Sequence, residues 1–323
     1  MKKLTLLLLA LWATLSTQAA SKYDNPDTLF VSRDGTCEFR NIDDAIEVCR
    51  AFMEYHKVIF VKKGTYKEKL VIPSWLTNIE ICGEDRDHTV ITYDDHANIK
   101  LPGTDRPMGT FRTYTLKIEG SNITLKNITV ENNAARLGQA VALHTEGNRL
   151  VFVNCRFLGN QDTVYTGVAG TRLYFKDCYI EGTTDYIFGP STAWFEHCDI
   201  YSKINSYVTA ASTPAAQAYG YVFNHCTLTA AAGVTQMYLG RPWRPYAYTL
   251  FMNCELGGFI HPAGWYNWNN PDNEKTARYC EYNNHGAGVA TQQRVSWSRQ
   301  LSKKEAANIT PSKVFANDTA WLP

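Results

Sequence analysis

Two stretches of the chain carry a cysteine and an aspartate in the same register, and this repetition constrains the fold most. CRFLGNQDTVYT places Asp162 seven residues after Cys155, and CYIEGTTDYIFG places Asp185 seven residues after Cys178. The two cysteines and the two aspartates are both separated by 23 residues. A chain that repeats a spacing in this way is built from similar units.

The cysteine pattern extends well beyond these two stretches. RLVFVNCRF, RLYFKDCYI, AWFEHCDI, GYVFNHCTL and TLFMNCEL share it, and NITLKNITV (122–130) reads as an earlier copy with Asn127 at the cysteine position. The intervals along the chain are 28, 23, 20, 28 and 28 residues. Self-similarity at this period is typical of a solenoid.

The units predict an all-β solenoid. Apolar residues alternate at period two, and Gly, Asn, Asp and Thr clusters separate the units, which indicates short strands joined by turns. We therefore expect a parallel β-helix whose coils stack about 4.8 Å apart. NIDDAIEVCRAF (41–52) has helical spacing with Asn41 as cap, so it predicts a helix that covers the first coil. The tail from about residue 261 loses the repeat and is expected to pack along the outside.

The cysteines are expected to be small buried residues inside the coils. One inward thiol per coil would form a column that includes Cys155, Cys226 and Cys254. Cys178 and Cys198 would lie on consecutive coils, so a disulfide between them is geometrically feasible.

Composition and the N-terminus narrow the class of protein. Residues 1–20 combine Lys2 and Lys3, an apolar run and small residues, which predicts a signal peptide; residues 21–323 then form one domain. No later segment is long and apolar enough to span a membrane. With 32 Lys and Arg against 31 Asp and Glu, and no basic stripe, nucleic acid is a poor partner. Histidine and cysteine spacing does not suggest a metal site.

The repeated register brings Asp162 and Asp185 side by side. Two carboxylates about 4.8 Å apart do not ionise equally, so one becomes an acid and the other a base or nucleophile. Gln139 and Gln161 could donate to an oxyanion, although neighbouring strand residues face opposite ways unless a strand ends there. Arg241 could hold one carboxylate ionised. The alternative interpretation is a pair of turn aspartates and a loop arginine.

Ordered motifs along the chain resemble those of the pectin methylesterases. The matching segments are GTYKEKL (64–70), GTF (109–111), QAVAL (139–143), GNQDTVY (159–165), GTTDYIFG (182–189) and LGRPW (239–243), followed by PAGWYNW and ARYCEYNNHGAG in the tail. The resemblance implies a right-handed parallel β-helix. It also implies a pectinesterase that acts on methyl-esterified polygalacturonan without a cofactor.

The resemblance also implies roles for single residues. Asp185 corresponds to the nucleophile and Asp162 to the general acid and then base, with Gln161 and Gln139 as stabilisers of the anionic intermediate. Arg241 corresponds to the residue that orients the nucleophile. The positions that match substrate-binding residues are Thr110, Gln139, Tyr165, Phe188, Arg241 and Trp243. Family members can link the cysteines that flank the nucleophile, here Cys178 and Cys198.

Three rival functions stay open at this stage. A β-helix with paired aspartates could be a glycoside hydrolase of the pectin backbone, because about 5 Å suits a retaining carboxylate pair. The chain could also act on another ester, such as a thioester, or only bind carbohydrate. It contains no GxSxG motif for a serine esterase. The short Lys-Lys leader suggests a bacterial exported protein, periplasmic or extracellular, and we expect a monomer.

Overall fold

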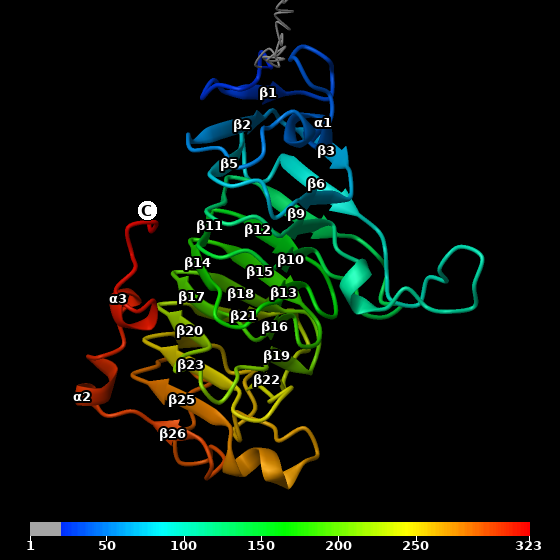
Figure 1. Ribbon diagram of the computed structural model, residues 1–323. Coiled ribbons are helices and arrows are strands. Elements are labelled where there is room, and N and C mark those ends of the chain that lie inside the picture. Colours follow the sequence, from blue (N-terminus) through cyan, green and yellow to red (C-terminus); the bar gives the residue numbers. More distant parts are fainter. Residues whose placement is uncertain (1–20) are drawn as a thin grey trace, which may run out of the picture.

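The computed structural model describes residues 21–323 and winds them into a solenoid of three parallel sheets (Figure 1). Each complete coil contributes one strand to sheet A, one to sheet B and one to sheet C, in that order, and consecutive coils pair in parallel, whereas the first and last coils contribute fewer strands. The predicted parallel β-helix is therefore confirmed. The predicted signal peptide, residues 1–20, lies outside the described residues.

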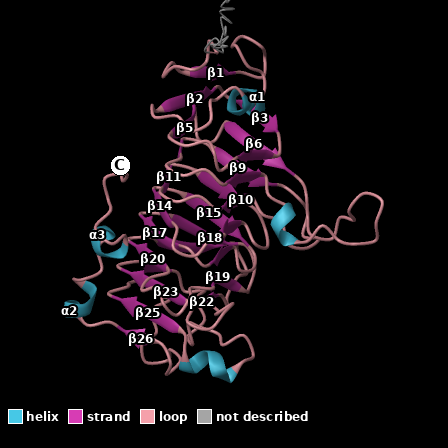
Figure 2. Cartoon of the chain, in the orientation of Figure 1, coloured by secondary structure: helices cyan, strands magenta, loops and turns pink. Residues whose placement is uncertain are grey.

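Short strands make up each sheet, with short turns between them (Figure 2). Sheet A contains β1 (Leu29–Val31), β2 (Lys57–Val61), β5 (Ile79–Gly83), β8 (Thr124–Lys126), β11 (Leu150–Val153), β14 (Arg172–Lys176), β17 (Thr192–Glu196), β20 (Tyr221–Asn224), β23 (Tyr248–Met252), β25 (Arg278–Tyr282) and β26 (Arg299–Gln300). Sheet B contains β3 (Gly64–Lys67), β6 (Thr89–Tyr93), β9 (Thr129–Asn132), β12 (Arg156–Leu158), β15 (Tyr179–Gly182), β18 (Asp199–Ser202), β21 (Thr227–Ala230) and β24 (Glu255–Leu256). Sheet C contains β4 (Leu70–Ile72), β7 (Leu116–Ile118), β10 (Leu143–Thr145), β13 (Val164–Thr166), β16 (Ile187–Gly189), β19 (Tyr207–Ala211) and β22 (Tyr238–Gly240).

The turn that follows each of seven sheet A strands contains one residue of a shared backbone conformation, and in five of them this residue directly precedes a repeat cysteine. That residue has a left-handed backbone, which Asn, Asp and His adopt more readily than other side chains. The residues concerned are Asn127, Asn154, Asp177, His197, His225, Asn253 and Asn283, with φ between 48° and 56°. The strand register, in which Lys126 pairs with Val153, places Asn127 opposite Asn154 and Ile128 opposite Cys155. The expectation that Asn127 occupies the cysteine position was therefore wrong by one residue.

Two columns of side chains fill the interior of the coils. The five cysteines of the repeat are buried and free. Cys178 and Cys198 are both free, without the disulfide between them that sequence spacing made feasible. Each sulfur donates to a backbone carbonyl of the previous coil, that of Phe152 and of Phe175 respectively. Beside the thiols, phenylalanine rings stack at centroid distances of 4.3 to 4.6 Å; the rings are Phe152, Phe175, Phe195, Phe223 and Phe251.

The predicted N-terminal helix forms, but it is shorter than the pattern suggested. Helix α1 (Ile42–Glu47) buries Ile42 and Ile46 beside β1, β2 and β4. Asn41 occupies the N-cap position, yet its side chain makes no cap hydrogen bond. The carboxylate of Glu68 accepts from the backbone N–H groups of Ile42 and Asp43 instead, at 3.2 and 3.0 Å.

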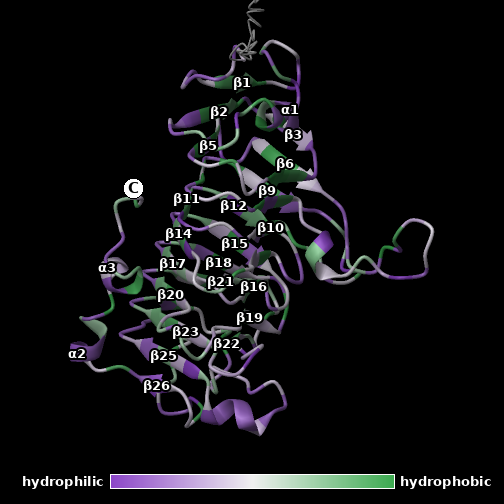
Figure 3. Ribbon diagram, in the orientation of Figure 1, coloured by the Kyte–Doolittle hydropathy of each residue, from purple (hydrophilic) through white to green (hydrophobic). Residues whose placement is uncertain are grey.

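The C-terminal tail packs along the outer face of sheet A, as expected, although the solenoid continues past residue 261 through β25. After the 3-10 helix η2 (Pro271–Lys275), the helices α2 (Lys303–Ala306) and α3 (Pro311–Val314) lie outside the stack (Figure 1). Phe315 and Val314 pack against a cluster that includes Tyr174 and Trp194. Figure 3 shows strands that mix hydrophobic and hydrophilic residues, and a hydrophilic η2 at the lower end of the view.

Candidate active site

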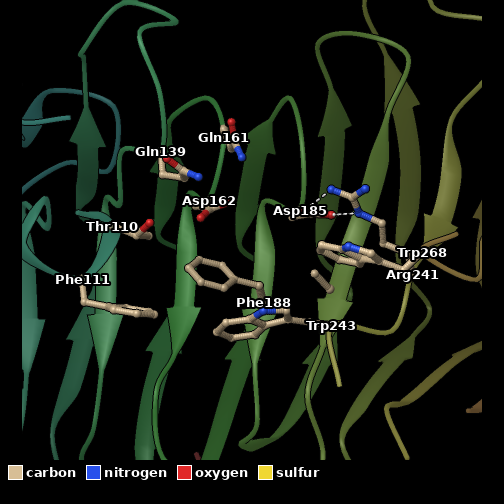
Figure 4. Close-up of a pocket in the computed structure, with 11 residues that line it drawn as sticks. Thr110, Phe111, Gln139, Gln161, Asp162, Asp185, Phe188, Arg241, Trp243 and Trp268 are labelled. Carbon is tan, nitrogen blue, oxygen red and sulfur yellow. Dashed lines mark hydrogen bonds and ion pairs between the residues drawn. The ribbon is translucent and has the colours of Figure 1, made fainter. Parts of the chain in front are cut away.

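A cleft lies over the outer face of sheet C, where the strands of successive coils run side by side (Figure 4). The 3-10 helix η1 (Thr110–Arg112) contributes one wall. The lining consists of Thr110, Phe111, Gln139, Gln161, Asp162, Asp185, Phe188, Ala210, Arg241, Trp243 and Trp268. The structure thus brings the predicted carboxylates, amides and arginine to one place.

Asp162 and Asp185 occupy equivalent positions on adjacent coils. Each lies two residues before a strand of sheet C, and the pairing of Val164 with Ile187 keeps them in register. The N–H of Asp162 donates to the carbonyl of Thr184 at 3.0 Å. Both aspartates have left-handed backbones, with φ of 68° and 50°. Aspartate adopts this backbone more readily than most residues, and here it turns both side chains into the cleft just before their strands begin.

The left-handed residue also explains how Gln161 reaches the cleft. In a regular strand Gln161 and Asp162 would face opposite sides, but the backbone turns at Asp162 before β13 begins, so both side chains line the cleft. Gln139 lies one coil earlier, and the N–H of the adjacent Ala140 donates to the carbonyl of Gln161 at 3.0 Å. Figure 4 shows both amides on the same side of the aspartate pair.

Arg241 contacts only one of the two aspartates. Its Nε donates to Oδ1 of Asp185 at 2.9 Å, and its Nη2 donates to Oδ2 at 2.7 Å. The guanidinium lies between two aromatic rings, 3.9 Å from the centroid of Tyr207 and 3.7 Å from that of Trp268. A fork of this kind stabilises an ionised carboxylate and fixes its orientation.

The two carboxylates differ in protonation. Burial raises the pKa of Asp162 well above its usual range, and the nearby charge of Asp185 raises it further. Burial also raises the pKa of Asp185, but the hydrogen bonds and charge of Arg241 oppose that increase. These opposing effects favour the proton on Asp162 and the negative charge on Asp185.

Aromatic rings form the floor and one wall of the cleft. Phe188 and Trp243 lie within 5.8 Å of each other, and Phe111 approaches Trp243 at 6.5 Å. Tyr165 is the strand partner of Phe188, so it lies beside that ring on the same face of sheet C; the two rings stack at 4.7 Å, and Tyr165 also approaches Phe111 at 4.9 Å. Sequence reasoning missed Phe111 and Trp268. Phe111 follows Thr110 in the GTF motif, which could have indicated it.

The remaining polar groups near the cleft have structural roles. His144 is buried beside Phe111 and Tyr165, and burial lowers its pKa to about 4. Its Nε2 lies 3.0 Å from the carboxylate of Glu146. Within residues 21–323, His, Cys, Asp and Glu side chains form no group of three or more that could hold a metal ion.

Comparisons with known proteins point to a single family. A sequence model described as Pectinesterase matches residues 28–318. Pectinesterase 31 of Arabidopsis thaliana is 37% identical over 303 residues, which cover 90% of this chain and 94% of that protein. Several other curated plant relatives are named probable pectinesterase/pectinesterase inhibitor, and this chain spans about half of their length.

Solved structures agree with that finding. Pectin methylesterase from carrot matches with a TM-score of 0.84 and 30% identity, covering 93% of this chain and 96% of that one. A pectin methylesterase in complex with a hexasaccharide matches with a TM-score of 0.79 and 29% identity, covering 91% and 98%.

Proposed function

This chain belongs to the pectinesterase family, and we propose that its cleft on sheet C hydrolyses the methyl esters of pectin through Asp185 and Asp162. The protein is a carboxylic ester hydrolase that releases methanol and leaves de-esterified galacturonate units. The observation that carries the residue assignment is the unequal pair: an arginine fork holds Asp185, whereas burial and the charge of Asp185 raise the pKa of Asp162.

In the first step, an oxygen of ionised Asp185 attacks the ester carbonyl carbon at C6 of a galacturonate unit. Negative charge develops on the carbonyl oxygen, where the amides of Gln139 and Gln161 can donate hydrogen bonds. The carbon–methoxy bond then breaks, and Asp162 gives its proton to the departing oxygen, which leaves as methanol. The product of this step is an anhydride between Asp185 and the sugar.

In the second step, water opens the anhydride. Asp162, now a carboxylate, removes a proton from the water as its oxygen attacks the same carbonyl carbon. The bond to Asp185 breaks, and the nucleophile returns to the arginine fork while the galacturonate leaves as a free acid. Every proton and leaving group in this sequence is handled by side chains that line the cleft.

The walls of the cleft support a sugar polymer as the substrate. Trp243 and Phe188 offer flat apolar faces beside the aspartates, and Thr110 adds a hydroxyl. Arg241 contacts Asp185 and is positioned to contact substrate as well. Pockets for small ligands commonly combine apolar walls with a few convergent polar groups. Tyr165, partly exposed and stacked beside Phe188, extends this aromatic face toward Phe111 and would contact the substrate too.

The glycosidase alternative is less well supported. A retaining glycosidase also needs two carboxylates about 5 Å apart, so the pair alone does not discriminate. Two neutral amides beside the pair suit an oxyanion on a carbonyl, whereas a glycosidase transition state carries positive charge on the sugar. Another ester substrate would need a differently lined cleft.

Export and oligomeric state belong to the same proposal. We infer that residues 1–20 are a signal peptide and that the mature enzyme works as a monomer in the periplasm or outside the cell. It needs no metal or cofactor, and neither nucleic acid nor membrane is among its partners. Across residues 21–323, no helix combines the length and apolar character that a membrane crossing requires.

The test uses highly methylated pectin, a chelator and the mature protein. Methanol, reducing ends and unsaturated products are followed together, and we expect methanol alone. Asp185→Ala should abolish its release. Asp177→Ala is the matched control, because Asp177 has the same left-handed backbone, with φ of 54°, but is exposed at a turn outside the cleft. New reducing ends without methanol, or near-normal turnover by Asp185→Ala, would overturn the assignment.

A further inference from the structure

A row of side chains leads from the aspartate pair toward the C-terminal end of the solenoid. Asp185 and Tyr207 are equivalent positions, because the N–H of Asp185 donates to the carbonyl of Tyr207 and β16 pairs with β19. Tyr207 in turn pairs with Tyr238. His261 stacks on Tyr238 at 4.4 Å. On the two coils that follow Asp185, the equivalent positions on the outer face of sheet C are therefore tyrosines, Tyr207 and Tyr238.

A second pocket opens at the end of this row. Its aromatic lining is Tyr238, Trp265, Tyr266 and Trp297, and its polar lining is Asn267 and Glu274. The ring of Tyr266 lies 5.3 Å from that of Tyr207 and 5.5 Å from that of Tyr238. The pocket therefore adjoins the aromatic row.

The same chain segment forms part of both sites. WYNW (265–268) gives Trp265 and Tyr266 to the second pocket and Trp268 to the cleft, where Trp268 covers the guanidinium of Arg241. Two register steps separate Asp185 from Tyr238, which corresponds to about 10 Å along the solenoid. A polymer lying across sheet C could reach both sites at once.

The charge of the second pocket points to a neutral occupant. Its lining contains no Lys or Arg, and Glu274 contributes a carboxylate that accepts from the amide of Asn267 at 2.7 Å. A free galacturonate would meet a like charge there, whereas a methyl-esterified unit would not. Asn267 adds an amide to the lining. The pocket thus offers aromatic faces and hydrogen-bonding groups without a cation.

We propose that the second pocket is a distal subsite that holds a methyl-esterified galacturonate unit of the same polymer whose scissile ester lies at Asp185. The inference rests on the proposed function, since it needs pectin in the cleft. It makes the enzyme favour esters that have methylated units on the C-terminal side of the cleft.

Reversing the charge of the pocket tests the proposal. Glu274→Lys should attract free galacturonate, so kcat/KM on sparsely methylated pectin should rise relative to densely methylated pectin. We expect a change in this ratio of roughly threefold, the size of an interaction between partly exposed charges. Asp272→Lys is the matched control: Asp272 lies in the same 3-10 helix, is exposed, and does not line the pocket. An unchanged ratio for Glu274→Lys, or an equal change for Asp272→Lys, would overturn the subsite.

Removing an aromatic wall gives a second, independent readout. Tyr266→Ala should lower kcat/KM about threefold to tenfold more on methylated hexamers than on methylated dimers, which are too short to span both sites. Equal losses on both lengths would assign Tyr266 to support of the cleft and overturn the subsite. Thermal unfolding checks that each variant folds. If the wild-type protein releases no methanol from either length, the proposed function itself fails, which is a different result.

Discussion

At the scale of single residues, Arg241 creates the difference between two otherwise equivalent aspartates. Asp162 and Asp185 share residue type, backbone conformation and position in the coil. Both are buried, with 8% and 5% of their surface exposed. Only Asp185 has a cationic partner, and that partner is itself fixed between the rings of Tyr207 and Trp268. The chemistry of the site therefore depends on a residue from a later coil.

Replacing Arg241 by lysine should show this dependence. A lysine keeps the charge but loses the two parallel hydrogen bonds and the stacking. Because Arg241 lowers the pKa of Asp185 against the effect of burial, its loss should move the acid limb of the kcat/KM profile to higher pH. We expect activity at the optimum to fall about tenfold to a hundredfold.

The matched control is Arg244→Lys. Arg244 lies over the ring of Trp243 and donates to a backbone carbonyl, but it has no carboxylate partner among the described residues. Its replacement should leave the pH profile in place. An acid limb that stays where it is in Arg241→Lys would contradict the role assigned to the fork.

At the scale of elements, stability resides in the columns that connect one coil to the next. The phenylalanine stack repeats once per coil, with neighbouring rings within 17° of parallel. The three inner rings, Phe175, Phe195 and Phe223, each contact two others, and the interior thiols lie alongside. A coil cannot bury its apolar side alone, so neighbouring coils stabilise each other.

Deletion of one central ring should be costly. Phe195 has no exposed surface and stacks on Phe175 and Phe223. Phe195→Ala should lower the free energy of unfolding by about 3–5 kcal/mol, measured by denaturant titration. Phe30→Ala is the control in the same sheet, since Phe30 is 45% exposed, and it should change stability by less than about 1 kcal/mol. Equal losses for both would argue against the stack as the main contact.

The elements also show what the sequence could and could not predict. The period-two pattern predicted the parallel β-helix, and the cysteine register predicted that the two aspartates lie side by side. Both features could be predicted because they depend on sequence spacing alone. The sequence alignment put Asn127 at the cysteine position, but Ile128 occupies it. The error arose because this coil has isoleucine, not cysteine, at that inward-facing position. Trp268 was missed because the tail that carries it has no repeat, so its position beside Arg241 depends on tertiary packing.

At the scale of the whole molecule, the cleft and the C-terminal tail occupy different faces. The cleft lies on sheet C. The tail packs against sheet A, and Figure 1 shows its helices α2 and α3 beside the strands of that sheet. Asp318 fastens the tail by accepting from Arg149 and Arg172, each at 2.7 Å. The side chain of Phe315 has no exposed surface and is buried between the tail and the outer face of sheet A.

Loosening the tail should therefore leave catalysis intact. Phe315→Ala removes its buried anchor, so amide hydrogen exchange should accelerate in residues 301–323 while kcat/KM for methanol release stays within about twofold. Phe52→Ala, at a side chain that is 73% exposed, should change neither quantity. A large loss of activity, or faster exchange throughout the coils, would show that the tail supports the whole solenoid.

The thiol column also bears on how the protein can be made and stored. All nine cysteines are free, and the five of the repeat are sealed inside the coils. Folding then requires no oxidant and no disulfide isomerase, so the chain should reach the same native state in reducing cytosol and in oxidising medium. Reductants in a buffer should leave the enzyme unharmed, and its buried sulfurs should react with thiol reagents only when the coils come apart.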